Sequence, residues 1–225
     1  MPGMRDVLVR HDAGFGAEVA ARLAAMLPAA RREPLDGPLA ADDVPPGGVL
    51  VLALDQPAPR LERLADELAL SRDAVLVPIA AEHQVVRIGP VLGPGAQATV
   101  DCYYRRVRQH YYGTGLTELH AAYDRAAARR TDGYLPSTAA AAAALTAALL
   151  RRLADGDRSD LQQVTVLSGL APRLDRARLT GVHGNARSAS PVPRADRSWA
   201  ALLPLARDLA RGLSAIDTAA EGAPR

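Results

Sequence analysis

The sequence predicts an α/β fold, with a Rossmann-like sheet flanked by helices. A short apolar run at residues 6–10 leads at once into a glycine-containing turn and a stretch in which Val19, Leu23 and Leu27 share one face at helical spacing. Residues 49–55, VLVLALD, form an almost continuous apolar run, as expected of a parallel strand covered on both faces. An amphipathic stretch at 58–73 and another apolar run at 74–80 repeat the alternation of helix and strand. Such alternation indicates a largely parallel sheet.

The middle of the chain contains more turn signals. Residues 28–48 are rich in proline and glycine, so we expect them to be mostly a connection between elements. A strand-like run at 83–92 is followed by the turn GPVLGPG and by a helix expected at 102–112. The sequence then predicts a long helix with Ser137 as its N-cap and Gly156 as its terminator. Its alanine run at 140–148 permits close helix packing, which suits either the core or a dimer seam.

The last third predicts two C-terminal antiparallel strands, at residues 161–169 and 176–184, joined through LAPRLD. Residues 197–216 predict a closing helix that is interrupted near Pro204. We therefore expect a single domain over residues 4–218 and a disordered tail at 219–225.

Composition excludes several classes of chemistry. All 27 basic residues among the 225 are arginine, and the net charge is only +2. Without lysine the chain can form no Schiff base, no Walker-type phosphate loop and no catalytic ammonium. Cys102 is the only cysteine, so no intramolecular disulfide can form, and we expect a reducing, cytoplasmic location. There is no signal-peptide pattern and no apolar run near the ~18 residues that span a bilayer.

The glycine turn after the first strand is the first candidate site. Gly14 and Gly16 would let backbone N–H groups approach a phosphate at a helix N-terminus, as nucleotide-binding turns do. Asp12 in the same turn would repel a phosphate. The alternative is a tight turn that remains from such a site.

Asp55 is the second candidate, because it ends a buried strand at the edge where open α/β sheets bind ligands. It could hold a magnesium ion or a ribose hydroxyl. The sequence DQPAP that begins with it could equally start a turn in which Asp55 caps the next helix. Position favours the first role and composition favours the second.

Two further features lie in the segment CYYRRVRQHYY. Cys102 could be a nucleophile if a histidine lowered its pKa, and His11, His120 or His183 could reach it through the fold, or it could be a small buried apolar residue. Arg105, Arg106 and Arg108 stand among four tyrosines, a mixture that can bind nucleic acid, an acidic peptide or a partner subunit, or simply face solvent. The small net charge argues against nucleic acid and favours an anionic peptide or a partner.

Three passages together resemble a known family, the ThiF/MoeB-like, ubiquitin-activating type of domain. The similarity is to its diverged form in the biosynthesis of thiazole/oxazole-modified (TOMM) peptides, the cyclodehydratase partner or leader-peptide-binding proteins that work beside a YcaO enzyme. The passages are VLVLALDQPAPRLERLADEL, the segment from VLVPIA through TVDCYYRRVR, and LQQVTVLSGLAPRLDRARLTGVHG. The resemblance extends from about residue 6 to 193 and implies a ThiF-type sheet with C-terminal antiparallel strands.

The chain also departs from that family. Members often hold a structural zinc with two CxxC pairs, whereas here Thr99 stands at the first position of the first pair, Cys102 at the second, and NARSASP holds no cysteine. Structural zinc takes four thiolate or imidazole ligands, so we expect no metal. Active members also use a lysine, an arginine and an acidic residue around ATP. This chain lacks lysine, and Gly14, Gly16 and Asp55 are what remains of the nucleotide set, so we expect no ATP cofactor.

The resemblance therefore implies a scaffold without chemistry of its own. It would work in the biosynthesis of a ribosomal azole-containing peptide, such as a thiopeptide, and position the precursor for a YcaO-type cyclodehydratase or another tailoring enzyme. Relatives commonly carry a winged-helix-like peptide clasp ahead of this domain, which we expect to be absent here or supplied by another protein. Arg105, Arg106 and Arg108 are the expected partner contacts, and a homodimer is expected. The alternatives are an active peptide-modifying enzyme, through adenylation or a new activity in the old crevice, and an unrelated Rossmann-like binding protein.

Overall fold

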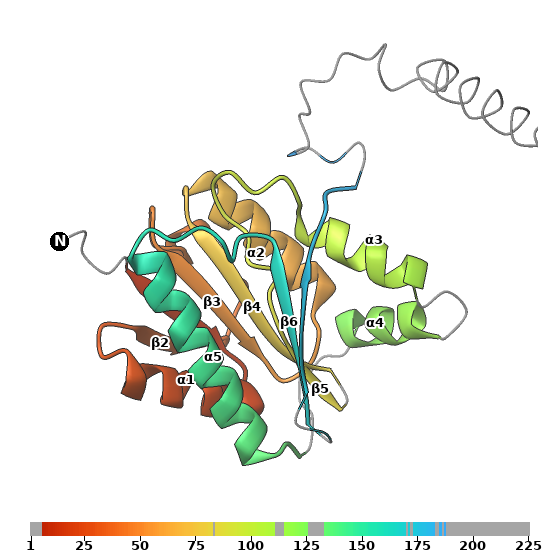
Figure 1. Ribbon diagram of the computed structural model, residues 1–225, viewed down its shortest axis with the longest axis horizontal. Coiled ribbons are helices and arrows are strands. Elements are labelled where there is room, and N and C mark those ends of the chain that lie inside the picture. Colours follow the sequence, from red (N-terminus) through yellow and green to blue (C-terminus); the bar gives the residue numbers. More distant parts are fainter. Residues whose placement is uncertain are drawn as a thin grey trace, which may run out of the picture. The chain divides into compact units, whose positions relative to one another are not determined.

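The computed structural model describes residues 6–82, 84–110, 115–125, 133–169, 171, 173–182, 185 and 187. The closing helix expected at 197–216 and the expected tail at 219–225 lie outside these residues, as does the end of the expected domain. Within the described part, helices cover both faces of one continuous sheet (Figure 1). The α/β class expected from the sequence is thereby confirmed.

The described strands form a seven-stranded sheet in the order β2-β1-β3-β4-β5-β6-β7. The first four in that order are parallel, and β5, β6 and β7 each pair antiparallel with their predecessor. Their bounds are β1 Val7–His11, β2 Arg31–Pro34, β3 Val49–Leu54, β4 Val75–Glu82, β5 Val85–Ile88, β6 Gln163–Ser168 and β7 Leu174–Arg178. The chain leaves β1 toward β2 and later leaves β3 toward β4, so the strand order reverses between β1 and β3.

The helices divide between the two faces of the sheet (Figure 1). On one face α1 and α5 pack on the odd-numbered residues of β1, β3 and β4, which are mostly valines. On the other face α2 and α3 pack on the alternate residues of β3 and β4, which are mostly leucines. The bounds are α1 Phe15–Met26, α2 Pro59–Ser71, α3 Val100–His110, α4 Leu116–Arg125 and α5 Pro136–Ala154. Both sides of β3 are therefore buried, as its unbroken apolar sequence predicts.

The expected connection at 28–48 contains regular structure, and the prediction was wrong there. Residues 31–34, RREP, form β2 at the edge of the sheet, and Ala41–Asp43 form a short 3-10 helix, η1. An edge strand needs hydrogen bonds from one neighbour only, so β2 forms without an apolar pattern. Arg10 in β1 pairs with Asp43 and with Glu33, which fixes this segment to the sheet.

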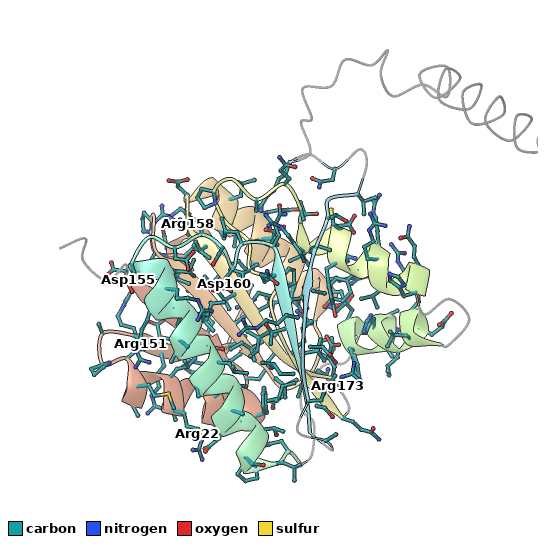
Figure 2. All side chains as sticks on the ribbon, in the orientation of Figure 1. Arg22, Arg151, Asp155, Arg158, Asp160 and Arg173 are labelled. Carbon is teal, nitrogen blue, oxygen red and sulfur yellow. The ribbon has the colours of Figure 1, made fainter. Side chains whose placement is uncertain are left out.

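The long helix α5 packs beside α1, and Arg151, labelled in Figure 2, donates a hydrogen bond to the carbonyl of Met26 at 3.1 Å. The expected cap at Ser137 was wrong, because the N-cap of α5 is Leu135, two residues earlier. The expected terminator is confirmed: Gly156 has a positive φ of 85° just beyond the last turn. Ala139, Ala142 and Ala147 are fully buried, so much of the alanine-rich face belongs to the core.

The predicted C-terminal antiparallel pair is present as β6 and β7, with β7 beginning two residues before its predicted start. The helix expected at 102–112 is α3, whose described part begins at Val100. Helix α4 was not predicted. No helix among the described residues is long and apolar enough to cross a membrane.

Candidate functional site

The three residues expected at a nucleotide site meet at the carboxyl ends of β1 and β3. Gly14 and Gly16 lie in the turn that begins α1, and Asp55 directly follows β3. The N–H of Gly14 donates to Oδ2 of Asp55 at 2.9 Å, and the N–H of Gly16 donates to Oδ1 at 2.8 Å. We call this pair of hydrogen bonds the Asp55 contact. It lies where the strand order reverses, the position at which open α/β sheets bind their ligands.

The glycines are required by this contact. A Cβ on Gly14 would lie 2.8 Å from Oδ2 of Asp55, and a Cβ on Gly16 would lie 2.2 Å from the carbonyl oxygen of Ala53. Any larger residue would therefore push the turn away from the end of β3. The glycines that would serve a phosphate serve a side-chain carboxylate of the same chain.

Asp12 completes the arrangement. Its Oδ2 accepts a hydrogen bond from the N–H of Asp55 at 3.0 Å, and its own N–H donates to the carbonyl of Ala53 at 2.9 Å. Asp55 is fully buried and Asp12 nearly so. Two carboxylates thus occupy the beginning of α1, where a nucleotide-binding turn would hold its phosphates. The alternative in which Asp55 caps α2 is also not what the structure shows, because the N-cap of α2 is Ala58, whose N–H donates to Glu62.

A cavity of 530 Å³ opens at the same edge of the sheet. Phe15, Tyr123 and Tyr134 contribute its aromatic wall, and residues of β5 contribute another side. Phe15 and Tyr134 touch edge to face, with ring centroids 5.9 Å apart. No charged side chain is among its described lining residues, so the cavity suits an uncharged group.

Cys102 lies at the centre of a second cluster, which joins the start of α3 to the segment after β7. Its Sγ accepts hydrogen bonds from the hydroxyl of Thr99 at 3.3 Å, the N–H of Val182 at 3.3 Å and the side-chain amide of Asn185 at 3.1 Å. No described histidine donates to it. Burial raises the pKa of Cys102, but these donors outweigh burial and hold the pKa below its ordinary value.

Two pairs of residues with equal spacing face each other in this cluster. Thr99 and Cys102 are three residues apart, and so are Val182 and Asn185 on the facing segment. The donor set offers one thiol and no imidazole from the described residues, so it does not fit a structural zinc, which takes four such ligands. Groups of three or more His, Cys, Asp or Glu placed to hold a metal are absent from the described part of the chain. Hydrogen bonds to sulfur connect the two segments there instead.

The same C-terminal segment is anchored by Arg187. Its guanidinium pairs with Oδ1 of Asp66 in α2 at 2.8 Å, and both side chains are almost completely buried. Burial raises the pKa of Asp66, and the charge of Arg187 offsets part of this effect. Residues more than 100 positions apart thus hold α2, α3 and the end of the described chain together.

A buried ionic network, which the sequence analysis missed, lies under α2 and α3. Arg87 of β5 is fully buried and donates to both oxygens of Glu62 at 2.8 and 3.0 Å, and to Glu82 at 2.5 Å. The hydroxyl of Tyr104 donates to Glu62 at 2.8 Å. Burial lowers the pKa of Arg87, but the two carboxylates outweigh it and raise the pKa, so the guanidinium stays charged. The available signal was an arginine inside the apolar run VVRI.

Aromatic rings surround this network. The Arg87 guanidinium lies 4.8 Å from the centroid of the Tyr103 ring, and His120 of α4 packs edge-on against Tyr104. Burial lowers the pKa of His120, so its imidazole is neutral near pH 7. The network is therefore a structural connection between β5, α2, α3 and α4, and it is closed to solvent at Arg87.

The arginines expected to contact a partner all lie on α3, on the opposite face of the sheet from α1. Arg105 pairs with Asp101 one turn earlier at 2.5 Å. Arg106 donates to the hydroxyl of Thr180 at 3.4 Å, and its side chain faces the strands β6 and β7. Arg108 is exposed beside Arg105. The structure thus separates the three arginines from the Asp55 contact and divides them between two sides of one helix.

Fold and site together define an α/β domain with a Rossmann-like sheet in which the glycine turn after β1 is held by the chain's own carboxylate. No known family profile and no curated protein matches the sequence. Solved structures do share the fold. The chain superposes on the heterocyclase TruD with a TM-score of 0.52 and 16% identity, covering 79% of this chain and 26% of TruD. It therefore spans about a quarter of the length of TruD.

Two bacterial structures cover more of both chains. The E. coli microcin synthetase McbBCD complex gives a TM-score of 0.62 at 11% identity, over 83% of this chain and 69% of the matched chain. E. coli MccB with ATP gives 0.53 at 10% identity, over 81% of this chain and 67% of MccB. TM-scores above 0.5 at such low identities show a shared fold. The resemblance stated from the sequence is confirmed at the level of the fold.

Proposed function

We propose that this chain is a non-catalytic, ThiF-like partner protein in the biosynthesis of a ribosomal azole-containing peptide of the thiopeptide type. It positions the precursor peptide for a YcaO-type cyclodehydratase or another tailoring enzyme, and it acts as a homodimer. The proposal is supported by the proteins that share its fold, which include a heterocyclase and a microcin synthetase. A heterocyclase in complex with substrate and cofactor is also among them.

The Asp55 contact is the observation that favours a scaffold over an ATP-dependent enzyme. A phosphate at the start of α1 would need the N–H groups of Gly14 and Gly16, which both donate to Asp55. It would also approach Asp12, whose carboxylate is held at the same place. The chain offers no lysine to offset this negative charge. Nucleotide binding therefore requires the contact to open and leaves two carboxylates beside the phosphates.

The test is a reconstitution with a YcaO-type cyclodehydratase and precursor peptide from the same genome. We expect azoline formation, followed by mass spectrometry, to accelerate when this chain is added. Isothermal titration of the chain alone with ATP and Mg²⁺ should give no heat of binding, and pyrophosphate exchange should be absent. Tight ATP binding or exchange would contradict the scaffold role, and unchanged azoline formation would contradict the partner role.

The carboxyl-edge cavity favours a second candidate, in which the chain itself modifies a peptide. The cavity has room for an apolar side chain and lies beside Phe15, at the start of α1. Of the two residues considered for such an enzyme, Asp55 lies at the same edge of the sheet as the cavity, whereas Cys102 packs on the opposite face, with α2 and α3. If peptide maturation stopped in a folded Asp55→Ala or Cys102→Ala variant, this candidate would replace the scaffold.

A further inference from the structure

The last described strand leaves one side of its backbone open. All five residues of β7 are exposed, and within the described ranges no strand pairs with its outer side. Arg173, labelled in Figure 2, stands just before the strand and pairs with Asp175 at 2.8 Å. An open edge of this kind can accept an additional strand through main-chain hydrogen bonds.

The register identifies which backbone groups are open. The N–H of Ser168 donates to the carbonyl of Arg173 at 3.0 Å, and the N–H of Leu179 donates to the carbonyl of Gln162 at 2.7 Å. In an antiparallel pair, hydrogen-bonded positions alternate along each strand. Residues 173, 175, 177 and 179 therefore face β6, and the N–H and C=O groups of Leu174, Arg176 and Arg178 face outward.

A groove runs beside this edge, between α3 and the strands β6 and β7, and we call it the α3–β7 groove. Its volume is 620 Å³. Val164, Val166 and Ala177 contribute apolar side chains from the strands, and α3 contributes Tyr103 and Val107. At its rim are the cationic Arg106 and the side chain of His110. The groove thus has an apolar interior with positive charge at the α3 side.

The other face of β7 is also basic. Arg176 is directly opposite Thr165 and so lies on the face away from Val164 and Val166. Arg178 is opposite Gln163 and also contributes to the lining of the α3–β7 groove. The acidic residue of the strand, Asp175, is paired with Arg173. A strand added to β7 would place alternate side chains in the apolar groove and the others beside Arg176 and Arg178.

We propose that the outer edge of β7 and the α3–β7 groove bind an extended peptide segment in which apolar and acidic residues alternate. Main-chain hydrogen bonds to Leu174, Arg176 and Arg178 hold the segment, the groove takes its apolar side chains, and the arginines pair with its carboxylates. This inference rests on the proposed role in handling a peptide and assigns that role to a surface. Of the three arginines of α3 that were expected to contact a partner, it assigns peptide contact to Arg106, which lines the groove.

The test uses the full chain and short acetylated peptides with a fluorescent label, measured by anisotropy. One peptide alternates valine with glutamate, a second has the same composition in two blocks, and a third alternates valine with lysine. We expect binding of the first peptide alone. The Arg176→Pro variant removes an outward N–H without breaking the β6–β7 ladder, as edge positions allow. It should weaken binding by about tenfold or more.

Matched variants separate the contributions. Arg176→Gln loses the same charge but keeps the N–H, and we expect binding about two- to threefold weaker. Arg106→Glu should weaken binding more than Arg108→Glu, which changes the same charge outside the groove. Unchanged far-ultraviolet circular dichroism in each variant establishes that the sheet is intact. Equal affinity of Arg176→Pro and Arg176→Gln, or equal binding of all three peptides, would overturn the proposal.

Three further outcomes are decisive. A wild-type homodimer that Arg176→Pro converts to monomer would show that a second copy occupies the edge, and this would also overturn the proposal. If the chain bound the alternating peptide selectively but had no effect on azoline formation, peptide binding by the groove would stand and the proposed biosynthetic role would be contradicted. If the Arg176→Pro variant accelerated azoline formation as much as wild type does, the biosynthetic role would stand, but the α3–β7 groove would have no part in it.

Discussion

Replacing Asp55 by alanine tests whether the carboxylate stabilises the fold as an internal anion. The variant leaves the N–H groups of half-buried Gly14 and buried Gly16 without their acceptor. A hydrogen bond to a charged group contributes about 1.5–3 kcal/mol, and the two share one carboxylate, so we expect a loss of about 3 kcal/mol. For a domain of this size each kcal/mol lowers Tm by about 2–4 °C, which gives a decrease of about 6–12 °C.

The assay is thermal unfolding followed by circular dichroism, with Asp36→Ala as the control. Asp36 is an exposed aspartate, so the same chemical change there should alter stability by less than about 0.5 kcal/mol. Asp55→Asn, which keeps one acceptor oxygen but places an amide beside the second N–H, should fall between wild type and Asp55→Ala.

Anion rescue makes the test specific. Formate has the geometry of the missing carboxylate, so it should raise the Tm of Asp55→Ala above its value in chloride at equal ionic strength. Wild type and Asp36→Ala should show no such difference. A stability loss below about 1 kcal/mol, or formate rescue of all three proteins alike, would refute the assignment of Asp55 as a structural anion.

Two other substitutions test the clusters that hold the described chain together. Glu62→Gln leaves Arg87 buried with a weaker partner, and we expect the free energy of unfolding in urea to fall by about 3–5 kcal/mol. The double variant with Arg87→Met should recover much of this loss. Additive losses from the two substitutions would contradict the network. Cys102→Val should cost about 2 kcal/mol more than Cys102→Ser, because valine offers no acceptor to the N–H of Val182 or to the side-chain amide of Asn185, which keeps its hydrogen bond to the carbonyl of Gln97. The lowered pKa of Cys102 adds stability that is complete above 9.0, the ordinary pKa, and is lost as the pH falls through the folded pKa. Wild type should therefore gain stability relative to Cys102→Ser as the pH rises toward 9.0. A constant difference between these two proteins across that range would contradict the assigned direction.

The elements that were predicted well have local signals. The buried strand β3 is apolar at every position, and the amphipathic helix α2 shows one apolar face. The pair β6–β7 was predicted because two strand-like runs flank a proline-containing turn. In each case the signal lies within the segment itself or in the turn beside it, so neighbouring residues carry enough information.

The misplaced elements lack such a signal. The strand β2, RREP, has no apolar residue that faces a core, and it forms because β1 offers it a hydrogen-bonding edge. The N-cap of α5 depends on where the preceding chain enters the helix, and in the structure this residue is Leu135. For β2, the position of the segment at the edge of the sheet therefore overrode its local propensity. For α5, the path of the preceding chain decided which residue is the cap.

Composition and sequence order determined that this protein is an α/β domain with no lysine and a single thiol, and those facts alone exclude lysine chemistry and an internal disulfide. Only the tertiary structure decided what Asp55 and Cys102 do. The partners of Asp55 are about 40 positions away, and two of the three donors to Cys102 are about 80 positions away. A carboxylate or a thiol has the same sequence signature whether it meets a ligand or a backbone N–H group. The difference arises only when the fold brings distant segments into contact.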